Sequence, residues 1–226
     1  MNNIRKIAIF MVLFSVLVVY SFGDSFYSMS GGFYRYFEQY PEENYGRDME
    51  GGNFIISLNY YPEAFLIGWY LRTSFGGSYN GFEWKGNEME PTYSYSVSDI
   101  QISAGPSYRF KLGSMVHIPI SLGPFFSIYR EERDYYYDID YIDYNSNMGF
   151  FSALNLGLHA DVSIIINPFK WFTIVNGIYS SFDLLHWERG SMNGRYRSIN
   201  NGKFEFQNYN AAKIGFYFGL GLHFEQ

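Results

Sequence analysis

Apolar and polar residues alternate along the C-terminal stretch 214–224. Its even positions are all apolar, while its odd positions are small, polar or charged. A β-strand sends successive side chains to opposite faces, so this pattern predicts a strand with one apolar and one polar face. A period of two also fits 100–110, 116–129 and 154–166 better than a helical period does.

Four more segments, 26–37, 53–60, 65–75 and 172–184, show the same alternation less cleanly. In the last of them, Asn176 and Ser180 interrupt the apolar face. With the four clean segments they predict about eight strands in one domain, without an internal domain boundary.

The connections between these strands alternate in length. Tight turns are predicted at 61–64, 111–114 and 167–168, and long polar segments at 38–52, 76–96, 130–147 and 188–208. A meander with short turns at one end and long loops at the other is typical of membrane barrels. We therefore predict an all-β fold: an antiparallel up-and-down transmembrane β-barrel of about eight strands, with short periplasmic turns and long extracellular loops.

The first residues read as an export signal. Arg5 and Lys6 precede an uncharged apolar run, 7–20, and small residues follow it. We expect residues 1–23 to be a signal peptide cleaved after Gly23, and residues 24–226 to form the barrel domain. The alternative, a retained transmembrane helix, is disfavoured because the run is shorter than the ~20 residues that a span needs.

Composition narrows the classes of protein further. The chain has no cysteine, which excludes disulfides and thiol chemistry, and its formal net charge of −6 disfavours nucleic acid as a partner. Aromatic residues make up 22% of the chain. Such an excess fits two girdles of rings at the membrane–water interfaces.

The same alternation would also suit a soluble lipocalin-like barrel with its apolar face inward. Glycines on the polar face favour a narrow polar interior instead, as do the opposite charges spaced along it. We predict that these charges form a paired network in the lumen, because burying an unpaired charge is costly. The predicted members are Arg72, Asp99, Arg109, Asp161 and Lys213. A gate whose ion pairs open a thin pore is the alternative to this structural role.

On this pattern, the chain resembles the small eight-stranded outer-membrane barrels, namely the transmembrane domain of outer-membrane protein A and the X- and W-type proteins. The resemblance covers essentially all of the chain after the signal. It implies location in the cell outer membrane, contact with membrane lipid, and insertion by the barrel-assembly machinery. It also implies a C-terminal assembly signal of alternating residues ending in an aromatic ring, here Phe218, Leu220, Leu222 and Phe224. The chain departs from that signal in that Glu225 and Gln226 follow the last ring.

Candidate chemistry is sparse. His117, His159 and His223 fall on the polar face without metal-ligand spacing, so neither a metal nor a cofactor is expected. Ser180 and Ser181 precede His186 and Glu188 on one strand, which would suit the Ser–His–acid set of a lipid deacylase, but no nucleophile motif supports it. Carboxylates in the tyrosine-rich segment 130–147 are a weak calcium candidate; they are Asp134, Asp138, Asp140 and Asp143.

The sequence thus predicts a non-enzymatic barrel with a structural or surface-recognition role, whose long loops contact an extracellular ligand or host factor. The alternatives are a narrow pore or conduit for small hydrophobic solutes, an outer-leaflet lipid-modifying enzyme, and a soluble lipocalin-like binder.

Overall fold

A computed structural model describes residues 23–40, 45–62, 65–85, 88–92, 95–139, 142–192, 205–207 and 210–224. These ranges hold ten strands: β1 (Gly23–Tyr40), β2 (Tyr45–Pro62), β3 (Ile67–Lys85), β4 (Glu88–Thr92), β5 (Tyr95–Leu112), β6 (Val116–Ile139), β7 (Ile142–Phe169), β8 (Phe172–Met192), β9 (Glu205–Gln207) and β10 (Asn210–Phe224). They contain no helix, and so none that is long and apolar enough to cross a membrane. Apart from Gly23, the predicted signal peptide lies outside the described residues.

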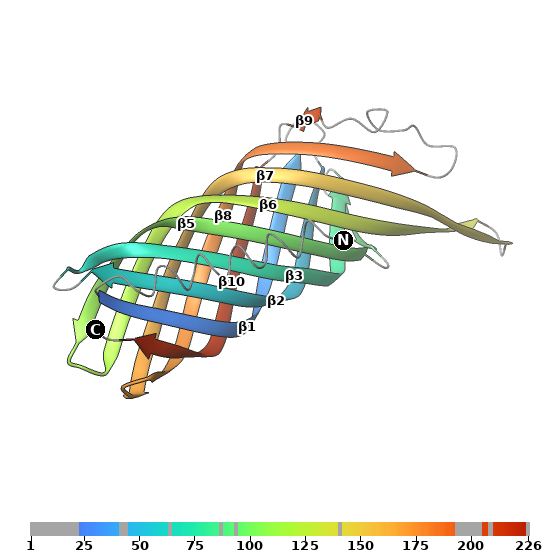
Figure 1. The fold of residues 1–226 in the computed structure, drawn as a ribbon. Helices are drawn as coiled ribbons and strands as arrows, with labels where there is room; N and C mark the ends of the chain where they lie inside the picture. The colour runs from blue at the N-terminus through green and yellow to red at the C-terminus, as the bar shows by residue number, and fades with distance from the viewer. Residues whose placement is uncertain are drawn as a thin grey trace, which may run out of the picture.

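The strands close into a barrel (Figure 1). Each long strand pairs antiparallel with its neighbour in sequence, and β10 pairs with both β1 and β8. The two short strands, β4 and β9, only extend the hairpins by pairing with β3 and β8. Eight strands therefore form the wall, which confirms the predicted up-and-down barrel.

The apolar face of the wall points outward. On β10, Phe216 and Phe218 are 58% and 55% exposed, while Tyr217 between them is buried. Lys213, on the same face as Tyr217, is also buried. The same alternation holds along β5, β6 and β7. An inward apolar face, as a soluble lipocalin-like barrel requires, is therefore wrong for this chain.

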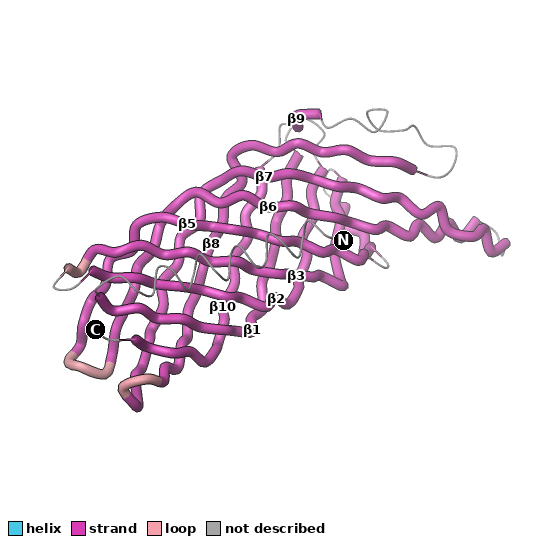
Figure 2. The backbone as a smooth tube through the Cα atoms, viewed as in Figure 1, coloured by secondary structure: helices cyan, strands magenta, loops and turns pink. Residues whose placement is uncertain are grey.

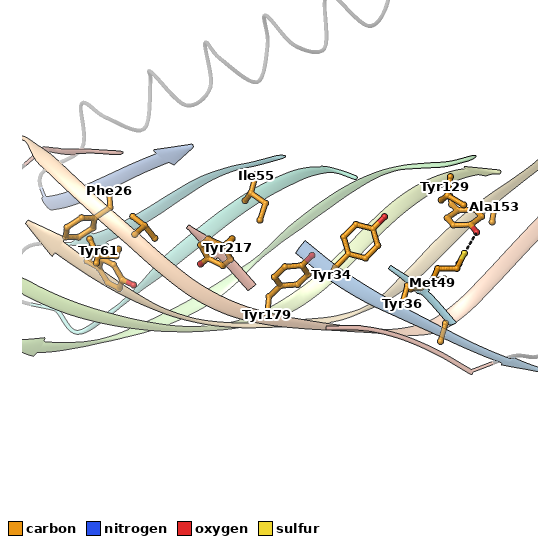
Figure 3. Packing of buried hydrophobic residues seen from close by; sticks show 14 residues of the cluster. Phe26, Tyr34, Tyr36, Met49, Ile55, Tyr61, Tyr129, Ala153, Tyr179 and Tyr217 are labelled. Carbon is orange, nitrogen blue, oxygen red and sulfur yellow. Dashed lines mark hydrogen bonds between the residues drawn. The ribbon is translucent and has the colours of Figure 1, made fainter. Parts of the chain in front are cut away.

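The interior mixes polar side chains with tyrosines, which the girdle interpretation of the aromatic residues did not anticipate. Figure 3 shows buried residues spread along the barrel from Phe26 and Tyr61, past Tyr217 and Tyr179, to Met49 at the other end. A phenol suits this place because its ring fills volume while its hydroxyl finds a hydrogen-bond partner.

Several strands run past the predicted ones into the segments expected to be loops. The longest extension is the β6–β7 hairpin, which continues pairing up to Ile139 opposite Ile142 and projects from one end of the barrel (Figures 1 and 2). The polar segment predicted as the loop 130–147 is thus largely paired strand.

The short turns gather at the opposite end, together with the beginning of β1 and the end of β10 (Figure 1). The turn between β5 and β6 includes Gly113, whose φ of 71° suits glycine. The turn predicted at 167–168 is misplaced: β7 continues to Phe169, and the turn lies at 170–171. The backbone N–H of Asn167 donates to the Met115 carbonyl at 2.7 Å, which holds this residue in the paired region.

Candidate functional site

All five charged residues predicted for the lumen point inward and are buried. The structure brings four of them together as two ion pairs: Arg72 with Asp161, and Lys213 with Asp99. The fifth, Arg109, is not near either pair. It bonds instead to a carboxylate at the short-turn end of the barrel.

The Arg72–Asp161 pair lies against two neighbouring tyrosines. The guanidinium lies 4.4 Å from the Tyr179 ring centre and 4.5 Å from that of Tyr217, within cation–π distance of both rings. The Tyr217 hydroxyl donates to both Asp161 oxygens at 3.0 Å. The carboxylate thus receives hydrogen bonds from two strands, β3 and β10, that lie apart in the wall.

The Lys213–Asp99 pair links β10 to β5 across the lumen. The Lys213 ammonium also lies 4.3 Å from the ring centre of Tyr34 on β1. Nearby, the Tyr36 hydroxyl donates to Asp183 at 3.2 Å, which adds a carboxylate that the sequence did not single out. Of these contacts, the Lys213–Asp99 pair joins opposite parts of the wall, while the two tyrosine contacts join strands on either side of β10 or next to it.

Arg109 donates to Asp24 at 2.5 Å, and the Lys111 ammonium lies 3.3 Å from the same carboxylate oxygen. Burial alone would raise the pKa of Asp24, but the hydrogen bond and charge of Arg109, supported by Lys111, outweigh it and lower that pKa below its ordinary value. Sequence reasoning missed Asp24 because it is the first residue after the predicted signal and precedes every alternating segment.

Two glycines make room for the central tyrosines. In the pairing of β8 with β10, Gly177 on β8 lies directly opposite Tyr217 on β10. Gly215 on β10 likewise lies opposite Tyr179 on β8. A Cβ added at either glycine would come within 2.6 Å of the facing ring. The glycines on the polar face therefore let large rings lie flat inside a narrow barrel.

The three histidines predicted on the polar face do not converge. His159 accepts or donates a hydrogen bond with Ser181 at 2.9 Å in the middle of the lumen. His117 and His223 lie near the short-turn end with ring centres 6.1 Å apart, and the Phe26 ring stacks on His223. Among the described residues no group of three or more potential ligands is placed to hold a metal.

Of the deacylase candidates, His186 and Glu188 lie together, with 3.7 Å between Nε2 and Oε2, but neither serine joins them. Ser180 is exposed on the outer face, whereas Ser181 and His186 point inward. Ser181 bonds to His159 and Gln101, while His186 bonds to Asn155 at 2.6 Å. The side chains of the four candidate calcium ligands, Asp134, Asp138, Asp140 and Asp143, lie outside the described set.

Inward side chains fill the section that the structure describes. A cavity of about 20 Å³ lies beside the Lys213–Asp99 pair and is lined partly by Tyr34 and Ser127. A buried water needs roughly 10–15 Å³, so this cavity has room for about one. The ion pairs and tyrosines therefore occupy the lumen at this level of the barrel.

The chain resembles known proteins in its structure rather than in its sequence. No family model matches the chain, and no curated protein matches it. Among solved structures, a major outer membrane protein from Thermus thermophilus shares 14% identity at a TM-score of 0.55, covering 89% of this chain and 99% of that one. The outer membrane protein OprG from Pseudomonas aeruginosa shares 11% identity at a TM-score of 0.56, covering 91% and 98%.

These likenesses show the fold, which is that of the small eight-stranded outer-membrane barrels. The outer surface of this chain supplies the physical reason for its location. Over the described residues, the eight wall strands close antiparallel on one another, and the outward face of this wall is a belt of large apolar side chains. The chain is an outer-membrane β-barrel protein.

Proposed function

We propose that this chain is a plugged outer-membrane barrel that acts through its extracellular hairpins, in a structural or surface-recognition role. The observation that carries the proposal is the contrast between its two parts. Ion pairs and tyrosine rings occupy the lumen, while the β6–β7 hairpin extends well past the apolar belt. Function then resides in the projecting strands.

The composition of the β6–β7 hairpin supports a recognition role. Residues 131–144 include six carboxylates, one arginine and five tyrosines. Tyrosine supplies a large contact area with few rotatable bonds to order on binding. The excess of carboxylates favours a partner with a positively charged surface, whether an extracellular ligand, a host factor or a neighbouring envelope component.

The test combines conductance with binding. The refolded chain in a planar bilayer is expected to give no steady ionic current. On cells, the full-length chain is expected to bind cationic surface proteins in a salt-sensitive way. A variant with 134–148 replaced by a two-residue turn, which joins the paired residues Arg133 and Gly149, is expected to lose that binding. Heat-modifiable migration on a gel shows that the shortened variant keeps its barrel. Steady current, or binding unchanged by the shortening, would overturn the proposal.

A second candidate is a conduit for small hydrophobic solutes. It is favoured by apolar residues in the extracellular half of the interior, where Met49, Val97 and Phe125 are buried. In this role the chain would speed the passage of an uncharged apolar solute into liposomes, and shortening the hairpin would leave that rate unchanged. Loss of binding in the shortened variant supports the recognition role, whereas solute passage that the shortening leaves unchanged supports the conduit.

An enzymatic role is not part of the proposal. Ser181 and His186 have different partners inside the barrel, and Ser180 faces the opposite side of the wall. We expect the purified chain to hydrolyse neither lipid A nor phospholipid. Release of fatty acid from either lipid, lost on Ser181→Ala, would reverse this view.

A further inference from the structure

Four outward residues form a polar row across four neighbouring strands. Ser98 on β5 pairs with Arg130 on β6, Arg130 with Ser152 on β7, and Ser152 with Arg189 on β8. Ser98, Arg130 and Arg189 are exposed and Ser152 is half-buried. Hydroxyl and guanidinium groups thus alternate along one level of the outer wall.

The polar row borders the apolar belt at the extracellular side. One level nearer the short turns, the outward residues are Ile100, Ile128, Leu154 and Trp187, which pair across the same four strands. Trp187 also packs edge to face against Phe206 at 6.2 Å. A tryptophan at this level is typical of the boundary between hydrocarbon and head groups.

The two arginines frame β7 from either side. Their backbones are two strand spacings apart, about 10 Å, so both side chains reach a single head group between them. Arg130 and Arg189 each already have an interaction within the protein. With five N–H donors, each can still bond to phosphate oxygens, and guanidinium is the group best matched to them.

From this juxtaposition we propose that the row Ser98–Arg130–Ser152–Arg189 binds the phosphate of a phosphorylated glycolipid in the outer leaflet. The acyl chains of that lipid lie on the apolar row beneath. The polar row adjoins the apolar belt, which favours a lipid phosphate over a free phosphate. Only a lipid would contact the polar row with its phosphate and the apolar row with its acyl chains. This site is independent of the recognition role proposed for the hairpin.

Another outward arginine on the wall provides a matched control. Arg35 on β1 donates to Asp48 at 2.8 Å, so a neighbouring carboxylate compensates its charge. The Arg35–Asp48 pair lacks the alternating hydroxyls of the row. Replacing Arg35 removes the same side chain from the same kind of surface without touching the proposed site.

The experiment measures binding of bis-phosphorylated lipid A to the refolded full chain in detergent, by native mass spectrometry and titration. Two arginines near an anionic lipid surface are worth about 30-fold in affinity, so Arg130→Gln/Arg189→Gln is expected to bind about 30-fold more weakly. Arg35→Gln is expected to bind as the unaltered chain does. Arg130→Lys/Arg189→Lys keeps the charge and is expected to lose only part of the affinity.

Heat-modifiable migration shows that each variant retains its barrel, and the single glutamine variants carry the test if the double variant does not fold. The proposal is overturned if the folded glutamine variants bind lipid A like the unaltered chain, or if dephosphorylated lipid A binds equally well. Displacement of lipid A by an equal concentration of inorganic phosphate would indicate a free-phosphate site and would also overturn it.

Discussion

Arg72 and Asp161 lie 89 residues apart in the sequence and form a buried ion pair at the centre of the barrel. Their strands, β3 and β7, do not pair with each other in the wall. The ion pair therefore joins separate parts of the barrel through its interior, and it does so without backbone hydrogen bonds.

Removing one partner of the central pair leaves a buried, uncompensated charge. Asp161→Leu or Arg72→Met is expected to lower the free energy of unfolding by about 3–5 kcal/mol, whereas the double variant Arg72→Met/Asp161→Leu is expected to cost less than the two single changes together. Urea unfolding in lipid vesicles measures both. Strictly additive effects would mean that the two side chains do not interact. If a folded single variant also conducts ions, the pair acts as a gate rather than as packing.

The glycines opposite the central tyrosines predict a specific overpacking effect. Gly177→Ala places a Cβ within 2.6 Å of the Tyr217 ring and is expected to destabilise the barrel by about 1–3 kcal/mol. Tyr217→Leu is expected to relieve part of that cost. The matched control is Gly31→Ala on the outer face, where the added Cβ meets nothing within 4 Å and unfolding should change little. Equal effects at the two glycines would contradict the packing argument.

Asp24 predicts a pH dependence at the short-turn end. Its pKa in the folded chain is below the ordinary value of 3.8, so its contribution to stability is complete above that value and is lost as the pH falls below it. Unfolding midpoints measured from pH 6 downward are expected to fall more steeply below about pH 4 in the unaltered chain than in Asp24→Asn. Parallel curves for the two proteins would show that the Arg109 contact does not lower this pKa.

Lipid contact predicts a depth dependence along β10. Phe218 lies well inside the outward belt, and Phe224 ends it. Phe218→Lys is expected to cost about 2–4 kcal/mol in vesicles, and Phe224→Lys about 0–1 kcal/mol. Refolded protein in vesicles of defined thickness gives both values. Equal costs at the two positions would place this strand outside the hydrocarbon.

We propose that the outward row Phe218, Leu220, Leu222 and Phe224 serves as the C-terminal signal for the barrel-assembly machinery. Phe224→Ala is then expected to slow insertion in cells several-fold, because the machinery would bind this ring. Spontaneous refolding into vesicles is expected to stay unchanged, because it proceeds without the machinery. Pulse-labelled cells, assayed for the heat-modifiable form, supply the rate. Deleting Glu225 and Gln226 tests whether the ring must be terminal. Equal slowing in cells and in vesicles would mean that the ring only stabilises the strand.

The alternation of side chains determined much of the architecture from the sequence. Ile214 to Phe224 could only be a strand with two unlike faces, and eight such segments with connections of alternating length specify an antiparallel meander. The inward position of Arg72 and Lys213 followed from the same period of two, because parity along one strand is a local property. Parity does not say which strands end up across the lumen from one another.

The tertiary structure decided which side chains pair inside the barrel and how far the strands extend. Arg109 bonds to Asp24 rather than to Asp99 or Asp161, because the tilt and stagger of the closed wall set the level of each side chain along the axis. The fit of Tyr217 over Gly177 likewise depends on the register between β8 and β10. The β6–β7 hairpin continues past the apolar belt because backbone pairing does not require an apolar face. Apolar alternation in the sequence detects only the part of a strand that faces lipid, so it missed this extension.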